Sequence, residues 1–171
     1  MPRYVALLRG VSPQNLRMDA LRRCVEEAGF ADVRTVLSSG NVAFDARRSA
    51  EAALELRLEA AMQAQLGRAF HTIVRASDDL RVLLSTDPYT AHGIDADARR
   101  VVTFMRRPVP PRVALPLAAD GARVLAMAGR EAFTAYIPGP NGPVFMALIQ
   151  RAFGTDVTTR TWETVTRCAA A

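Results

Sequence analysis

The sequence predicts an α+β protein made of two similar halves. Two observations lead to this prediction: apolar patterns typical of strands and of helices alternate, and the order of these patterns repeats once along the chain. The chain has 171 residues, of which 50% are hydrophobic, so each half can bury a core. We therefore expect two tandem ferredoxin-like (βαββαβ) plaits packed together, over 1–85 and 100–171, joined by a linker at 86–99.

The first half follows the order strand, helix, strand, strand, helix, strand. Apolar runs predict the strands at 3–9, 33–38, 41–44 and 70–75. The first helix begins at Met18, where apolar positions recur at helical spacing, and ends at Gly29. The second helix is rich in Ala, Leu and Glu; we expect Ser49 to cap it and Gly67 to end it.

The second half repeats this order less clearly, and shares no obvious sequence identity with the first. After a short helix at 77–84 and the Pro-, Gly- and Asp-containing linker, the predicted elements are a strand at 101–106, a helix at 110–119, a hairpin at 123–128 and 131–137, and a helix at 143–153. Three prolines weaken the helix at 110–119, because proline fits a first turn but not a helix interior. Arg160 is expected to lead into a C-terminal helix.

The charged residues exclude several kinds of chemistry. All 22 basic residues are Arg, so Schiff-base lysines and Walker-type phosphate-binding lysines are excluded. The net charge of +5 is dispersed, which favours an ordinary solvated surface and disfavours nucleic-acid binding. No apolar stretch reaches the roughly 18–20 residues of a membrane span, and the N-terminal run lacks a cleavage site, so we expect a cytoplasmic protein that does not contact membranes.

Metal and cofactor sites are not expected. Two His and two Cys give no metal-binding spacing, and Cys24 and Cys168 are expected to be reduced and buried. We therefore predict no metal and no cofactor. The oligomeric state is left open by the sequence.

Three segments, which form two signatures, resemble a known bacterial family. Residues 7–11 (LLRGV) and 18–44 are similar to the N-terminal signature of the family of domain of unknown function 1697, and residues 158–170 resemble its C-terminal signature. The resemblance implies a compact α+β protein with ferredoxin-like halves and no established activity. It also implies differences: the family's loop after the first strand is rich in Gly and Asn and carries a Lys, whereas residues 11–17 here read VSPQNLR.

Polar residues in both signatures form the candidate binding site. They are Arg9, Asn15, Arg17, Ser39, Asn41 and Arg160, and we expect them to line a cleft between the halves. Arg side chains neutralise anions, and amides and hydroxyls hydrogen-bond to them. The alternative is that Asn15, Ser39 and Asn41 only shape turns. The loop at 139–143 superficially resembles a phosphate cradle, but two of its residues are prolines, which have no amide N–H.

The function expected from these observations is binding of a small anionic or nucleotide-like ligand in that cleft. One alternative is an enzyme that uses the same cleft, with Asp19, Asp45 and Glu163 as the candidate acids and bases. Another is a nucleic-acid-binding protein that uses the dispersed Arg residues, whose affinity would fall steeply with salt. No catalytic residue is assigned.

Overall fold

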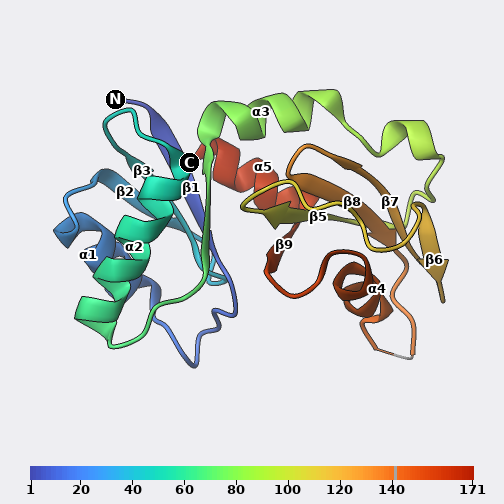
Figure 1. Ribbon diagram of the computed structural model, residues 1–171, viewed down its shortest axis with the longest axis horizontal. Coiled ribbons are helices and arrows are strands. Elements are labelled where there is room, and N and C mark those ends of the chain that lie inside the picture. Colours follow the sequence, from blue (N-terminus) through green and yellow to red (C-terminus); the bar gives the residue numbers. More distant parts are fainter. Residues whose placement is uncertain (141) are drawn as a thin grey trace. The chain divides into compact units, whose positions relative to one another are not determined.

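The computed structural model describes residues 1–140 and 142–171 and confirms a mixed α+β fold with two antiparallel sheets (Figure 1). The chain divides into two compact units. The first unit contains Met1–Leu84 and Thr166–Ala171, and the second contains Ser85–Val165. In this division, residues 86–99 belong to the second unit and the last six residues belong to the first.

The first unit contains a four-stranded sheet and two helices that cover one of its faces. Its elements, in chain order, are β1 (Arg3–Leu8), α1 (Met18–Glu27), β2 (Ala31–Val36), β3 (Asn41–Asp45), α2 (Glu51–Leu66) and β4 (Thr72–Ala76). The strands lie in the order β2-β3-β1-β4, so β1 is central and β2 and β4 are the edges. Helix α3 (Ser77–Thr86) follows β4 directly and crosses the boundary between the units.

The core of the first unit lies between this sheet and the apolar sides of α1 and α2. Leu21 and Cys24 of α1 and Leu58 and Met62 of α2 are buried against β-strand residues such as Phe44. Burying an aliphatic or aromatic side chain of this size contributes about 1.5–3 kcal/mol. The helical spacing read from the sequence therefore corresponds to the buried face of each helix.

The prediction that Ser49 caps α2 is wrong. The residue before the helix is Ala50, and its carbonyl accepts the first helical hydrogen bonds, from the amides of Ala53 and Leu54. Ser49 lies one residue too early, and its hydroxyl donates to the carbonyl of Arg47 at 2.9 Å. Its amide is also held, at 3.3 Å from the hydroxyl of Tyr4.

Two glutamates of α2 close the edge of the first sheet. Strand β4 pairs only with β1, so its other side presents unpaired amides. The carboxylate of Glu55 accepts a hydrogen bond from the amide of Val74, and that of Glu51 accepts one from Ala76, both at 3.0 Å. Glu51 and Glu55 are four residues apart on the helix, and Val74 and Ala76 are two residues apart on the strand. The two pairs span similar distances, because a strand rises more per residue than a helix. The two side chains thereby occupy the position that an additional strand would take.

The second unit contains a five-stranded sheet. Its elements are η1 (Thr90–His92), β5 (Arg99–Met105), β6 (Leu117–Ala119), β7 (Ala122–Ala128), β8 (Glu131–Tyr136), α4 (Val144–Phe153), β9 (Val157–Thr161) and α5 (Trp162–Ala170), whose last residues belong to the first unit. The strand order is β6-β7-β8-β5-β9. Helix α4 covers one face, where Leu148, Ile149 and Phe153 pack against Met105 and Val124.

Two expectations for the second unit are wrong. Residues 110–119 form no helix; the segment runs irregularly into β6, because Pro110, Pro111 and Pro116 remove the amides that a helix needs. Arg160 does not open the last helix but lies in β9, which pairs with β5 through the partners Arg160 and Val102. The segment VTTRT is short and β-branched, as strands are.

The segment expected to be a linker is anchored in the second unit. Tyr89 is completely buried, and its hydroxyl donates to the carbonyl of Val101 at 2.7 Å. Its ring packs edge-on against Phe133 and Trp162. Burial raises the pKa of the Tyr89 hydroxyl, which therefore stays protonated as a donor. Residues 86–99 are thus part of a fold rather than a free connection.

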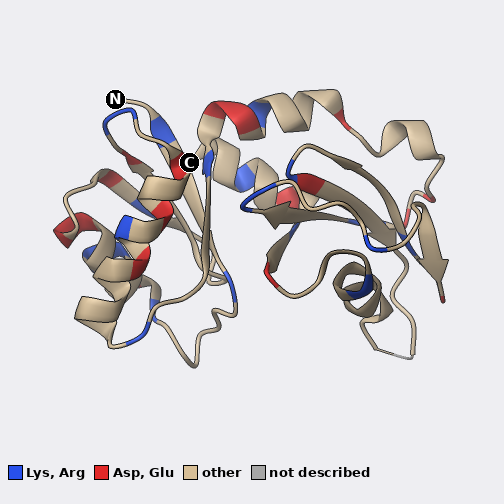
Figure 2. Cartoon of the chain, in the orientation of Figure 1, with Lys and Arg blue, Asp and Glu red and all other residues tan. Residues whose placement is uncertain are grey.

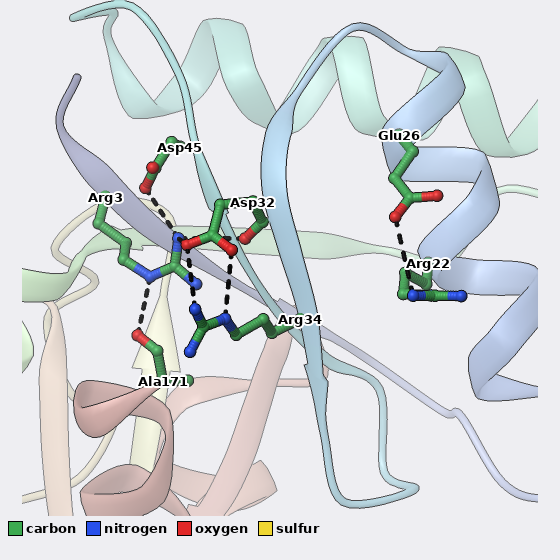
Figure 3. Close-up of polar contacts among 7 residues, drawn as sticks. All are labelled: Arg3, Arg22, Glu26, Asp32, Arg34, Asp45 and Ala171. Atoms are coloured by element: carbon green, nitrogen blue, oxygen red, sulfur yellow. Dashed lines mark hydrogen bonds and ion pairs between the residues drawn. The ribbon is translucent and has the colours of Figure 1, made fainter.

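Arg3 fastens the end of the chain to the first sheet (Figure 3). Its Nε donates to the main-chain oxygen of Ala171 at 2.7 Å. Its Nη1 donates to the Asp45 carboxylate at 2.8 Å and lies 3.2 Å from the Asp32 carboxylate. Arg34 also pairs with Asp32, at 3.2 Å. One guanidinium therefore joins β1, β2, β3 and the C-terminal residue.

No helix in the part of the chain that the structure describes combines the length and the apolar composition needed to cross a membrane.

Removing the carboxylate of Glu55 is expected to destabilise the protein. The Glu55→Ala variant leaves the buried amide of Val74 without its acceptor, which costs about 1–3 kcal/mol. The free energy of unfolding in urea measures the loss. Gln63→Ala, on an exposed position of the same helix, is the matched control and is expected to change stability by less than about 0.5 kcal/mol. Equal stability of the two variants would contradict the edge-closing role.

Removing the guanidinium of Arg3 is expected to loosen residues 166–171. In Arg3→Ala, the amides of this segment should exchange with solvent deuterium about tenfold faster, because hydrogen bonds to a charged group contribute about 1.5–3 kcal/mol. Hydrogen-exchange mass spectrometry makes the measurement. Arg22→Ala is the control, since Arg22 makes only an exposed pair with Glu26 at 4.0 Å (Figure 3). Unchanged exchange in Arg3→Ala would refute the fastening role.

Candidate functional site

The loop after β1 is held in shape by Asn15. The Asn15 side-chain oxygen accepts a hydrogen bond from the amide of Ser12 at 2.8 Å, and its nitrogen donates to the carbonyl of Gly10 at 2.7 Å. Arg17 precedes α1 and pairs with Asp19 at 3.4 Å, with both side chains largely in solvent. Arg9 is exposed. In this loop, Asn15 bonds the backbone, and the two arginines extend into water.

The turn between β2 and β3 is packed against the same loop. Asn41 is fully buried, and its side-chain nitrogen donates to the carbonyl of Val36 at 2.9 Å and to the hydroxyl of Ser39 at 3.0 Å. Gly40 has φ +86°, and a Cβ there would lie 2.8 Å from the Val11 side chain. The side chain of Asn41 therefore hydrogen-bonds to the backbone of the turn, which is compatible with the alternative that these residues shape turns.

Arg160 belongs to the other unit. It is 7% exposed, and its Nη1 donates to the hydroxyl of Thr158 and to the carbonyl of Thr159, both at 2.7 Å. The six sequence-predicted residues thus divide between the units, with Arg9, Asn15, Arg17, Ser39 and Asn41 in the first and Arg160 in the second.

Two of the candidate acid–base residues, Asp19 and Asp45, form ion pairs with arginines. Asp45 binds Arg3, and Glu163 is exposed on α5. Partial desolvation raises the pKa of Asp19, but hydrogen bonds from the Ala20 amide and from Arg17 outweigh it, so the net pKa of Asp19 is lowered. Asp19 is therefore ionised near neutral pH and is not suited to donate a proton.

The two cysteines are buried and form no disulfide. Burial raises the pKa of the Cys24 thiol, and the nearby Glu27 carboxylate raises it further. A thiol that stays protonated is a poor nucleophile and a poor metal ligand. Among the described residues, no three His, Cys, Asp or Glu side chains gather in a way that would hold a metal ion.

The basic residues are dispersed in space as well as in sequence. Figure 2 shows Arg positions in both units, interleaved with acidic positions on helices and strands alike. Several are engaged: Arg57 lies 4.2 Å over the ring of Phe30, and Arg68 lies 4.3 Å over that of Phe70. This distribution does not favour the nucleic-acid alternative, because such proteins usually concentrate their positive charge.

An aromatic-lined hollow lies at one end of the second sheet, on the face that α4 covers. We call it the Tyr136 hollow; it measures about 240 Å³ and is lined by Arg99, Asp120, Tyr136, Ile137 and Phe145, together with residues of the loop before α4. Arg99 and Ala122 are the register partners of Tyr136, so the three side chains share this face. Phe145 stacks on Tyr136 with 4.1 Å between ring centroids.

A second hollow lies around the same end of the sheet. We call it the Gly93 hollow; it measures about 500 Å³, and its lining includes Gly93, Asp95, Asp120, Gly121 and Arg123. Arg123 is the register partner of Ala135 and so belongs to the opposite face. Asp120, Ala122, Tyr136 and Ile137 line both hollows, which makes the two continuous around the sheet end.

The polar groups of the Tyr136 hollow are not used by the protein. Arg99 and Asp120 are exposed, and within residues 1–140 and 142–171 neither side chain makes a hydrogen bond or an ion pair. The half-buried Tyr136 contributes its ring to Phe145, while its hydroxyl has no hydrogen-bonding partner among the described residues. Unused polar groups around an apolar hollow are the usual composition of a small-molecule site.

Sequence reasoning missed most of this hollow. It singled out the loop at 139–143, of which Gly139, Pro140, Gly142 and Pro143 line the hollow and Asn141 lies outside the described residues. Arg99 falls at the end of the expected linker, and Tyr136 and Phe145 are ordinary apolar positions of a strand and a helix. No local pattern marked Arg99, because the strand expected there begins at 101.

Comparison with known proteins gives the family. The model of the family described as "Protein of unknown function (DUF1697)" matches residues 1–133. The chain belongs to this family. The match covers the N-terminal signature and ends before residues 158–170, which carry the expected C-terminal signature. No curated protein matches.

A solved structure shares the fold. It is described as the structure of conserved bacterial protein SP0830 from Streptococcus pneumoniae, with a TM-score of 0.72 and 17% sequence identity, covering 99% of this chain and 97% of that chain. At this identity the likeness establishes the fold alone.

Substituting Gly40 is expected to test the packing of the turn on the loop. Gly40→Ala places a Cβ 2.8 Å from Val11 and forces φ +86°, so the loss of stability should be about 2–4 kcal/mol. Gly67→Ala is the matched control, because φ is +72° there and nothing lies within 4 Å of the added Cβ, so only about 1 kcal/mol is expected. Urea unfolding compares the two; similar losses would show that the contact with Val11 does not matter.

Proposed function

We propose that this protein binds a small organic ligand that carries a planar ring and an anionic group, and that the Tyr136 hollow of the second unit is its site. The observation that supports this most is the set of unused polar groups around the hollow. A guanidinium, a carboxylate and a phenol surround an apolar space without a hydrogen-bonding partner among the described residues. The proposal keeps the anionic ligand expected from the sequence.

Stacking on Tyr136 and Phe145 is the reason for proposing a planar ring in the ligand. Tyr136 and Phe145 are both half-buried and nearly parallel, with an interplanar angle of 13°. A planar ligand ring gains area on such a surface, and stacked aromatic pairs contribute about 0.5–1.5 kcal/mol beyond burial. Pro138, Pro140 and Ile137 add further apolar lining. A ligand of one ring suits the volume of about 240 Å³.

The guanidinium of Arg99 is the reason for proposing an anionic group in the ligand. Arg99 is the register partner of Tyr136, so its side chain leaves the sheet next to the aromatic ring. A guanidinium forms two parallel hydrogen bonds to a carboxylate or a phosphate, which fixes the orientation of the group as well as attracting its charge. The site therefore favours a ligand whose anionic group is joined to its ring by a short chain.

The residues predicted from the sequence remain a second candidate set for an anion. Arg9 and Arg17 are exposed beside the loop at 10–16, and this arrangement is compatible with a surface anion. The Tyr136 hollow is favoured because Asn15, Ser39 and Asn41 already make hydrogen bonds within the protein. Asp19, Asp45 and Glu163, the candidate acids and bases of the enzyme alternative, are not among the described residues that line the hollow.

We also propose that both units are ferredoxin-like plaits. The element order of the first unit and its strand order β2-β3-β1-β4 support this for the first. In the second, β7-β8-β5-β9 repeats that strand order, and α4 occupies the place of the second helix. The irregular segment before β6 then stands where the first helix would be.

Titration with 3-phenylpropionate is expected to locate the site. This probe contains a ring and a carboxylate and no other polar group. In two-dimensional NMR spectra its addition should shift the amides of Tyr136, Ile137 and Phe145. Arg99→Gln should weaken the binding about fivefold, the effect of losing one charge-assisted hydrogen bond at an exposed site.

Arg107→Gln is the matched control, because Arg107 is exposed beyond the other end of the same strand, outside both hollows. Its affinity for the probe should equal that of the unaltered protein. Absence of binding, shifts confined to residues outside the hollow, or an equal effect of the two substitutions would each overturn the proposal.

A further inference from the structure

The charges around the two hollows differ in sign from one end to the other. Arg99 lines only the Tyr136 hollow, whereas Asp95 lines only the Gly93 hollow. Asp120 lines both. Arg123 belongs to the Gly93 hollow, but its Nη2 donates to the carbonyl of His92 at 3.2 Å. Arg99 is therefore the positive group at the aromatic end, and the Gly93 hollow carries two carboxylates and one guanidinium.

Asp120 is placed by the backbone at the junction of the hollows. Asp120 and Gly121 form the two-residue turn between β6 and β7, with φ +47° and +82°. Such turns favour Asp-Gly or Asn-Gly, because both central residues have positive φ. The turn explains why a small polar residue stands here but not why it carries a charge, since Asn would serve equally well. Its carboxylate makes no ion pair or hydrogen bond within the described residues.

Arg99 and Asp120 do not neutralise each other. Both line the Tyr136 hollow, yet no ion pair joins them. A ligand with one charge of either sign would meet attraction from one of these groups and repulsion from the other. A ligand with an anionic and a cationic group on the same short skeleton would satisfy both. A doubly negative phosphate bound to Arg99 would be repelled by Asp120, the carboxylate that lines the same hollow.

We infer that the ligand is zwitterionic: an amino acid, or a molecule with the same headgroup, whose side chain is a flat apolar ring. This inference rests on the proposed function and narrows the substrate class of the same site. The carboxylate binds the guanidinium of Arg99, the ammonium donates to the carboxylate of Asp120, and the ring lies against Tyr136 and Phe145. The Gly93 hollow, with Asp95, is open to any extension of the ligand beyond its ammonium group.

A matched pair of probes tests the inference. L-phenylalanine is 3-phenylpropionate with an ammonium group added at the carbon next to the carboxylate. Isothermal titration calorimetry at low salt should give about two- to fivefold tighter binding for L-phenylalanine, the usual size of an exposed charge pair. Adenosine monophosphate, whose phosphate is anionic and whose ring is larger, should bind more weakly than either.

The variant Asp120→Asn isolates the charge, because Asn-Gly suits the turn and the fold is retained. It should abolish the advantage of L-phenylalanine and raise the affinity for 3-phenylpropionate, because the carboxylate that repels this anion is gone. Asp97→Asn is the control: Asp97 is an exposed neighbour of Asp95 that lines neither hollow, so both affinities should stay as they are.

The outcomes separate this inference from the proposed function. Binding of 3-phenylpropionate that depends on Arg99, without any advantage of L-phenylalanine, overturns the zwitterion and leaves the proposed site standing. Tighter binding of adenosine monophosphate overturns it in favour of a nucleotide-like ligand. Failure of all three probes overturns both. An advantage of L-phenylalanine that Asp120→Asn removes and Asp97→Asn keeps supports it.

Discussion

A backbone amide or carbonyl that is taken out of water and not paired in a helix or sheet must find another partner, and this requirement organises much of the molecule. The carboxylates of Glu51 and Glu55 accept the outward amides of the edge strand β4. Asn15 closes the loop after β1, and Asn41 holds the turn before β3. The hydrophobic cores are possible because these polar groups are satisfied around them.

The need to satisfy the backbone also distinguishes polar residues with a structural role from those of the proposed site. Asn15, Ser39 and Asn41 looked like ligand-binding residues in the sequence, since they are polar and cluster in loops. In the structure their hydrogen bonds go to the protein itself. The side chains of Arg99 and Asp120 make no hydrogen bond or ion pair within the described ranges, and they line an aromatic hollow. Polar groups without a structural task are the better guide to a ligand.

In the second unit, one end of the sheet brings together the residues of the proposed site. Strand register puts Arg99, Tyr136 and Ala122 in one row, and the small side chain of Ala122 leaves space beside the ring. The tight turn at Asp120 brings a carboxylate to the same end. Phe145 comes from the start of α4, which the buried face of that helix fixes against the sheet. Four chain segments are needed, and none is sufficient alone.

The sequence by itself determined the α+β class, the family, the two helices of the first unit and most strands, because these depend on local apolar periodicity and on Gly and Pro at element ends. Residue types also determined that lysine chemistry is absent. Two predictions failed for different reasons. Residues 110–119 form no helix because their prolines remove amides that a helix needs, and Arg160 lies in β9, where pairing with the distant strand β5 decides its conformation.

Only the tertiary structure decided which polar side chains make no hydrogen bond within the described residues and so can serve the proposed ligand. The stacking of Tyr136 on Phe145 and the meeting of Arg99 with Asp120 at one hollow depend on strand register and on the docking of α4. Register is set by contacts between residues distant in sequence, and a single sequence carries no direct record of them. The physical reason is that periodicity specifies which face of an element is buried, but not what lies opposite it.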